Sequence, residues 1–77
     1  MPQFTVEKGK RYRATLQLSL LQSIATNEMV ADEFRKVGFT DVAVEGSGST
    51  RYATGLWSQD NATAEMPSEV SEITTIA

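Results

Sequence analysis

The sequence contains neither cysteine nor histidine among its 77 residues. Disulfides, thiolate metal sites and imidazole metal ligands are therefore excluded. A conventional catalytic triad cannot be assembled either, because its general base is a histidine. The neighbouring acids Asp32 and Glu33 would point about 100° apart on a helix, so they do not form an acid–base pair. We expect no catalytic residues, no metal, no cofactor and no enzymatic activity.

Long hydrophobic runs are also absent. No apolar run reaches 18 residues, which predicts no transmembrane helix and no membrane partner. Residues 1–13 are polar and basic and lack the apolar centre of a signal peptide. We therefore expect the protein to be cytoplasmic or part of a larger assembly. An apolar content of 40% and a charged content of 22% are ordinary for a globular chain, and the length predicts one domain over residues 1–77.

The clearest element in the sequence is an amphipathic helix over residues 26–39. Its apolar stripe, at helical spacing, consists of Val30, Ala31, Phe34 and Val37. Thr26 or Asn27 can cap the first free N–H groups, and Gly38 can end the helix with Phe39 packing back against it. This stripe predicts a helix that packs on a sheet, with Phe34 at the centre of a small core.

A long strand precedes the helix. Residues 11–20 alternate with a period of two, and the face that we expect to be buried carries Tyr12, Ala14, Leu16, Leu18 and Leu20. After the helix, residues 40–45 place Val42 and Val44 on one face. They lead through a four-residue loop, Gly46–Ser49, to a second strand over residues 50–57, which predicts a hairpin.

The strand over residues 50–57 has two candidate buried faces. Small side chains let a helix approach closely, so we expect the face with Ala53, Gly55 and Trp57 to be buried. Tyr52, Thr54 and Leu56 would then lie on the open face of the sheet.

The two ends of the chain carry weaker patterns. Residues 1–9 are expected to be a loose arm or a short edge segment, and residues 58–67 a polar connector. Residues 69–76 are rich in Thr and Ile, which favours a final strand. The basic residues 1–13 and the acidic residues 58–77 suggest that the first and last strands lie side by side.

The order of elements predicts an α+β fold. A right-handed crossover makes the strands on either side of the helix parallel, and the hairpin returns a third strand between them. The fourth strand can lie outside the first. This split β-α-β unit resembles half of a ferredoxin-like fold, with the order β-α-β-β-β. A single helix would pack on one face of a small, mostly antiparallel sheet.

The leading functional hypothesis follows from the sheet face that this helix leaves open. We expect a small non-enzymatic protein-interaction or structural module that binds a protein partner, or a second copy of itself, through that face. The candidate docking residues are Thr15, Gln17, Tyr52, Thr54 and Leu56.

The alternative hypothesis is a weak nucleic-acid-binding domain. Basic residues flank an aromatic residue in the first strand, as they do on some RNA-binding surfaces. The candidate contacts are Lys8, Lys10, Arg11, Arg13 and Arg51. The acidic composition, with a net charge of −3, argues against a dedicated nucleic-acid binder.

Overall fold

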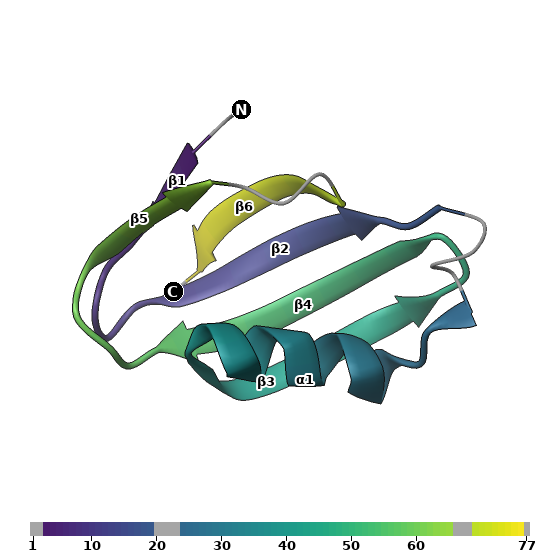
Figure 1. The fold of residues 1–77 in the computed structure, drawn as a ribbon, viewed down its shortest axis with the longest axis horizontal. Coiled ribbons are helices and arrows are strands. Elements are labelled where there is room, and N and C mark those ends of the chain that lie inside the picture. Colours follow the sequence, from purple (N-terminus) through teal and green to yellow (C-terminus); the bar gives the residue numbers. More distant parts are fainter. Residues whose placement is uncertain (1–2, 20–23, 66–68, 77) are drawn as a thin grey trace.

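The computed structural model describes residues 3–19, 24–65 and 69–76. Its elements, in chain order, are β1 (Gln3–Val6), β2 (Arg11–Gln17), α1 (Asn27–Val37), β3 (Phe39–Ser47), β4 (Thr50–Trp57), β5 (Ala62–Glu65) and β6 (Val70–Ile76) (Figure 1). The fold is α+β, with one helix against a small antiparallel sheet. The predicted inward position of Leu20 and the connection at residues 20–23 lie outside the described residues, as do residues 66–68 of the predicted connector.

The main sheet has four strands in the order β3-β4-β2-β6, and each neighbouring pair is antiparallel. The predicted strand order is thereby confirmed: β4 lies between β2 and β3, and β6 lies outside β2. The predicted faces are confirmed as well. Alternate residues of β2 and β4 are buried on the side of α1: Tyr12, Ala14, Leu16, Arg51, Ala53, Gly55 and Trp57.

The helix begins and ends as the sequence predicts. Thr26 caps it, because its Oγ1 accepts a hydrogen bond from the Met29 N–H at 3.2 Å. At the other end Gly38 donates its N–H to the carbonyls of Phe34 and Arg35 at 3.3 and 3.1 Å. Gly38 has φ +133°, a value that residues with a side chain rarely adopt. The chain can therefore turn directly into β3 after the last helical residue.

Both edge strands of the main sheet carry a bulge. The pairing of β3 with β4 shifts between Thr40 and Ala43, and the pairing of β6 with β2 shifts opposite Thr15 and Leu16. One extra residue keeps two apolar residues that are three apart on the same face of a strand. This explains why Val70 and Ile73 fit no period of two yet both pack against the core. It also explains how Phe39 and Val42 both pack there.

The structure decides between the two expectations for the start of the chain, because residues 3–6 form the short strand β1 and not a loose arm. The expectation for residues 58–67 needs correction: the predicted connector contains β5, which pairs with β1 in antiparallel register from Gln3↔Glu65 to Val6↔Ala62. This two-stranded sheet lies to one side of the main sheet in Figure 1. The β5 strand is exposed along its whole length. It therefore forms through pairing with β1 and not through burial of an apolar face, which is why its sequence shows no strand pattern.

Three local predictions are also wrong. The hairpin turn has two residues, Gly48 and Ser49, because Gly46 and Ser47 continue the ladder opposite β4. Val37 is 62% exposed, because it lies at an edge of α1 that the described residues leave uncovered. Phe34 is only half-buried, and Phe39 takes the central place in the core.

The core divides into two clusters under α1. One is aliphatic and joins β2, β4 and β6 to the helix through Ala14, Leu16, Val30, Ala53 and Val70. The other is aromatic and is centred on Phe39, whose ring packs edge to face against three others. The ring centroids of Trp57, Phe34 and Tyr12 lie 5.0, 5.9 and 6.5 Å from that of Phe39. In the described ranges, no helix has the length and apolarity needed to cross a membrane.

Candidate functional site

The helix is too narrow for the sheet beneath it. Four strands about 4.8 Å apart span about 14 Å between the outermost axes, whereas a helix with its side chains is about 10 Å wide. Helix α1 lies over β3 and β4, and the inner faces of β2 and β6 extend beyond it (Figure 1). An apolar groove of about 450 Å³ runs along this uncovered half of the sheet.

The floor and the walls of the groove are apolar. The floor is formed by Ala14 and Leu16 of β2 with Ala53 and Gly55 of β4. One wall is the helix, which contributes Val30, Phe34 and Val37, and the other is β6, which contributes Val70 and Ile73. Most of the floor is shared with the aliphatic core cluster, and Ala14, Leu16 and Ala53 are only 2–6% exposed. The groove is therefore a narrow cleft, and its solvent-accessible apolar surface lies higher up, at Phe34, Val37 and Ile73.

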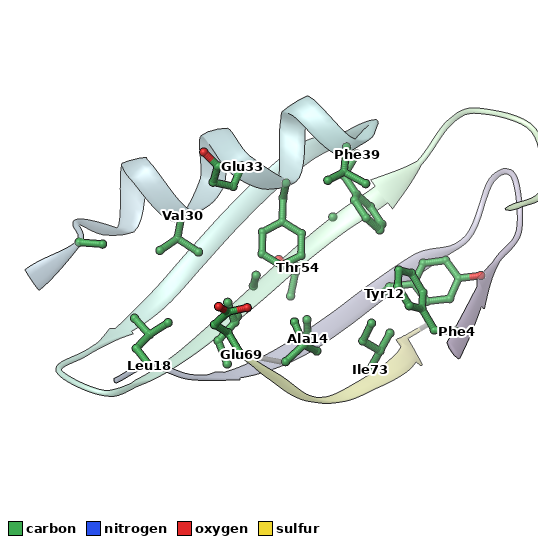
Figure 2. A pocket seen from close by; sticks show the side chains of 17 residues that line it. Phe4, Tyr12, Ala14, Leu18, Val30, Glu33, Phe39, Thr54, Glu69 and Ile73 are labelled. Carbon is green, nitrogen blue, oxygen red and sulfur yellow. The ribbon is translucent and has the colours of Figure 1, made fainter. Parts of the chain in front are cut away.

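Side chains from other elements close the two ends. Phe4 of β1 and Tyr12 lie at one end, and Leu18 lies at the other (Figure 2). The hydroxyl of Tyr12 is held at that end, because the N–H of Glu7 donates a hydrogen bond to it at 2.7 Å. Tyr12 of β2 and Leu18, the residue after β2, are six residues apart, which places them about 20 Å from each other in extended chain. The groove is therefore elongated.

Two charged side chains line the groove, and both are acidic. Glu33 comes from α1 and Glu69 from the residue before β6, on the opposite side of the groove (Figure 2). Glu33 accepts a hydrogen bond from Lys36 Nζ at 3.2 Å, in an ion pair that is largely exposed on both sides. Exposed pairs of this kind contribute little stability. A ligand cation can therefore compete with Lys36 for this carboxylate.

The apolar surface continues from the groove onto the exposed side of the helix. Met29, Glu33 and Val37 are spaced four residues apart, so they form one row along α1. Met29 is 58% exposed and Val37 is 62% exposed. The helix-side rim therefore has the pattern apolar, acidic, apolar.

Apart from Thr54 and the two acids, the lining of this groove is apolar, and its volume lies within the range of small-molecule pockets. Within the described residues there is no group of three or more acidic side chains placed to hold a metal ion.

Comparisons with known proteins give no match to a family model, a curated protein or a solved structure.

The predicted docking residues lie together on the opposite side of the sheet, which we call the outer face. Thr15 and Tyr52 are paired in register, as are Gln17 and Thr50. Tyr52, Thr54 and Leu56 are half-buried there. The guanidinium carbon of Arg13 lies 4.9 Å from the centre of the Tyr52 ring. Within this face, Thr50 Oγ1 donates to Gln17 Oε1 at 3.4 Å and Thr54 Oγ1 to the Ala43 carbonyl at 3.5 Å. The outer face is therefore largely polar.

The candidate nucleic-acid contacts are not gathered on one surface. Lys10 forms an ion pair with Glu7 at 3.0 Å, and the hydrogen bond that its ammonium donates to that carboxylate raises the pKa of Lys10. Arg11 forms an ion pair with Asp41, which the bulge in β3 places on the outer face. Lys8 lies in the loop after β1, where its N–H donates to Asn61 Oδ1 at 2.8 Å.

Arg51 is on the other side of the sheet from Arg11 and Arg13. It is 4% exposed, its Nε donates to the Gly48 carbonyl at 3.0 Å, and one of its terminal nitrogens donates to Asn27 Oδ1 at 2.9 Å. Asn27 in turn donates to the Gly46 carbonyl at 3.0 Å. This arginine therefore joins the start of α1 to the β3–β4 hairpin.

The first and last strands of the main sheet lie side by side, as their opposite charges predict, but the acidic residues of β6 are not paired with Arg11 and Arg13. Ile76 lies opposite Arg11 and Thr74 lies opposite Arg13, while Glu72 lies opposite Thr15. The bulge in β6 sets this register, and no sequence pattern places that extra residue.

Proposed function

We propose that this chain is a small non-enzymatic protein-interaction module and that the groove beside α1 is its binding surface. The observation that carries this proposal is the groove itself, about 450 Å³ of apolar space that lies over the floor of the core. Its rim is exposed at Met29 and Val37, and contiguous exposed apolar surface on a small folded chain commonly marks a binding site. A partner that covered the groove would complete the hydrophobic core.

The rim supports a protein as the ligand. Exposed Met29 and Val37 extend the apolar area beyond the groove, so a ligand that filled only the groove would leave them in water. Methionine and aromatic side chains are enriched in protein interfaces, and charged rims with apolar centres are their usual arrangement. The groove has that arrangement, with Phe34 in its wall and acids at its rim.

The outer face is a second candidate docking surface, because it presents a preordered pair of side chains. Arg13 stacks on Tyr52, and Tyr and Arg are the residue types that most often dominate binding energy at interfaces. Leu56 of the same face is half-buried and adds an apolar contact. Through this face the chain would bind another protein or a second copy of itself.

We also propose that β2, α1, β3 and β4 form a split β-α-β unit of the ferredoxin-like type. The strand order β3-β4-β2-β6 supports this proposal. The uncovered half of the sheet is where a second helix would pack in a full fold of that type. In this chain the segment between β4 and β6 contains β5, which pairs with β1.

Site-specific photo-cross-linking in the source cell separates the two surfaces. A benzophenone amino acid is placed at Val37 on the rim of the groove, and in a matched variant at Leu56 on the outer face. We expect a discrete protein adduct from position 37 and none from position 56. Adducts from position 56 alone would assign binding to the outer face, and no adduct from either position would remove the proposal.

A further inference from the structure

We infer that the groove receives an amphipathic α-helix of a partner protein, with basic residues placed to meet Glu33 and Glu69. This inference rests on the proposed function and specifies the chemistry of the partner. It depends on three properties of the groove: its dimensions, its apolar lining and the sign of the charge at its rim.

The dimensions fit a second helix. Counted with the full width of its four strands, the sheet is about 19 Å wide, and α1 covers about 10 Å of that over β3 and β4. About 9 Å is left over β2 and β6, which is about the width of one more helix. The length of about 20 Å between Tyr12 and Leu18 corresponds to about 13 residues of helix, at 1.5 Å per residue. An element of this size would lie beside α1 on the same side of the sheet.

The lining specifies the face that such a helix would present. Apolar side chains at i, i+4 and i+7 would enter the mouth of the groove between Phe34 of α1 and Ile73 of β6, both of which are half-buried. On the helix side, Val30 and Phe34 of α1 offer a ridge against which a second helix can pack. An extended strand would reach fewer of these positions, because its side chains alternate between two faces.

The rim specifies the charge of the partner. Glu33 lies on the α1 side of the groove and Glu69 on the β6 side, so a helix in the groove passes between two carboxylates. Lysine or arginine beside the apolar stripe would meet both, and their long stems would cover Met29 and Val37. An acidic helix would instead be repelled from both sides.

Selection from a displayed library of 14-residue helical peptides tests the inference without knowledge of the natural partner. The surface positions of the peptide are randomised. Peptides that bind the wild-type chain are kept, and those that also bind the Val37→Ser variant are removed. We expect sequences with an apolar stripe and with Lys or Arg beside it. Enrichment of acidic or non-helical sequences, or the loss of all binders when those that also bind Val37→Ser are removed, would overturn the inference.

Charge variants then test the role of the rim. For a selected peptide, Glu33→Gln and Glu69→Gln should each raise Kd about two- to fivefold, the effect of an exposed ion pair. Glu45→Gln is the matched control, because it makes the same charge change on an exposed residue of β3, and it should leave Kd unchanged. The difference should shrink at high salt. If Glu33→Gln and Glu69→Gln both leave Kd at the value of the wild-type chain, as Glu45→Gln does, the charges at the rim play no part and the inferred basic partner is wrong.

Two measurements identify other occupants. Sedimentation velocity that shows a dimer, abolished by Val37→Lys and retained by Leu56→Lys, would make a second copy the occupant and overturn the inference. Native mass spectrometry that shows a retained small apolar molecule would do the same. If position 37 cross-links to a protein while the library yields no basic helix, the inference fails and the proposed function stands. If the cross-links come from position 56 alone, both fail.

Discussion

Replacement of Phe39 by alanine should destabilise the fold more than any other single truncation in the helix or its C-terminal junction. Phe39 is buried and makes edge-to-face contacts with the rings of Tyr12, Phe34 and Trp57. Truncation of a buried phenylalanine costs about 3–5 kcal/mol. The upper part of that range applies here, because each edge-to-face pair adds about 0.5–1.5 kcal/mol beyond the area that it buries.

The total stability of a chain of this size sets the scale of that loss. At about 0.05–0.15 kcal/mol per residue, 77 residues give about 4–12 kcal/mol. A loss of about 4 kcal/mol should lower Tm by about 15–30 °C, at about 4–8 °C per kcal/mol. Thermal and urea unfolding, followed by far-UV circular dichroism, measure both quantities. Variants that remain folded at 10 °C can be compared through the midpoint of urea unfolding at that temperature.

Phe34→Ala and Val37→Ala are the matched controls for this experiment. Phe34 is half-buried in the groove wall and should cost less than Phe39, and Val37 is largely exposed and should cost well under 1 kcal/mol. The expected order of destabilisation is therefore Phe39, Phe34, Val37. If Phe34→Ala is the most destabilising of the three, the helix packs differently and the groove beside it does not have the lining described above.

Two further substitutions test local features of the fold. Gly38→Ala should cost about 1–3 kcal/mol, because φ is +133° and a Cβ would lie 2.5 Å from Gln59 Nε2 and 3.0 Å from the Trp57 ring. The control is Gly9→Ala, because Gly9 also has a positive φ but nothing lies within 4 Å of an added Cβ. If the two variants lose the same amount of Tm, the contact with Trp57 does not contribute. Arg51→Met should cost about 1–3 kcal/mol through the lost hydrogen bonds to Gly48 and Asn27. Hydrogen exchange should accelerate at the start of α1, and unchanged protection there would contradict the role of Arg51 as a link.

Much of the main sheet could be predicted from local patterns. The alternation in residues 11–20 predicted the buried face of β2, because each inward residue is apolar and each outward one is polar. The small residues Ala53 and Gly55 correctly predicted which face of β4 lies under the helix. The connections then restricted the strand order, because a crossover followed by a hairpin leaves few places for the third strand.

The elements that were missed do not depend on local patterns. Strand β5 buries no side chain and exists because β1 pairs with it, from residues about 60 positions away in the sequence. The bulges in β3 and β6 similarly depend on the register of a neighbouring strand. A bulge shifts the spacing of inward residues from two to three, which conceals the strand from a search for alternation. Long-range pairing decides both cases.

The groove could have been expected from a count of elements. Each helix covers about two strands, so a chain with one helix-forming stripe and four sheet strands leaves about half of one face uncovered. From the sequence, the docking surface is expected on the sheet face opposite the helix, and the face under the helix is expected to be fully covered. A count of elements does not predict which residues form the rim. Glu33 and Glu69 are 36 positions apart in the sequence, and they lie on opposite sides of the groove because β6 is placed next to β2.

The same residues serve the fold and the proposed binding site. Ala14, Leu16 and Val70 belong to the core cluster and also line the groove. A chain of 77 residues buries a smaller share of its surface than a larger domain does, and an uncovered groove reduces that share further. A ligand that binds the folded state alone stabilises it by RT ln(1 + [L]/Kd), about 2.7 kcal/mol at a ligand concentration 100 times Kd. Binding in the groove would therefore add an amount comparable to the loss of one core side chain, which makes completion of the core and recognition of the partner the same physical event.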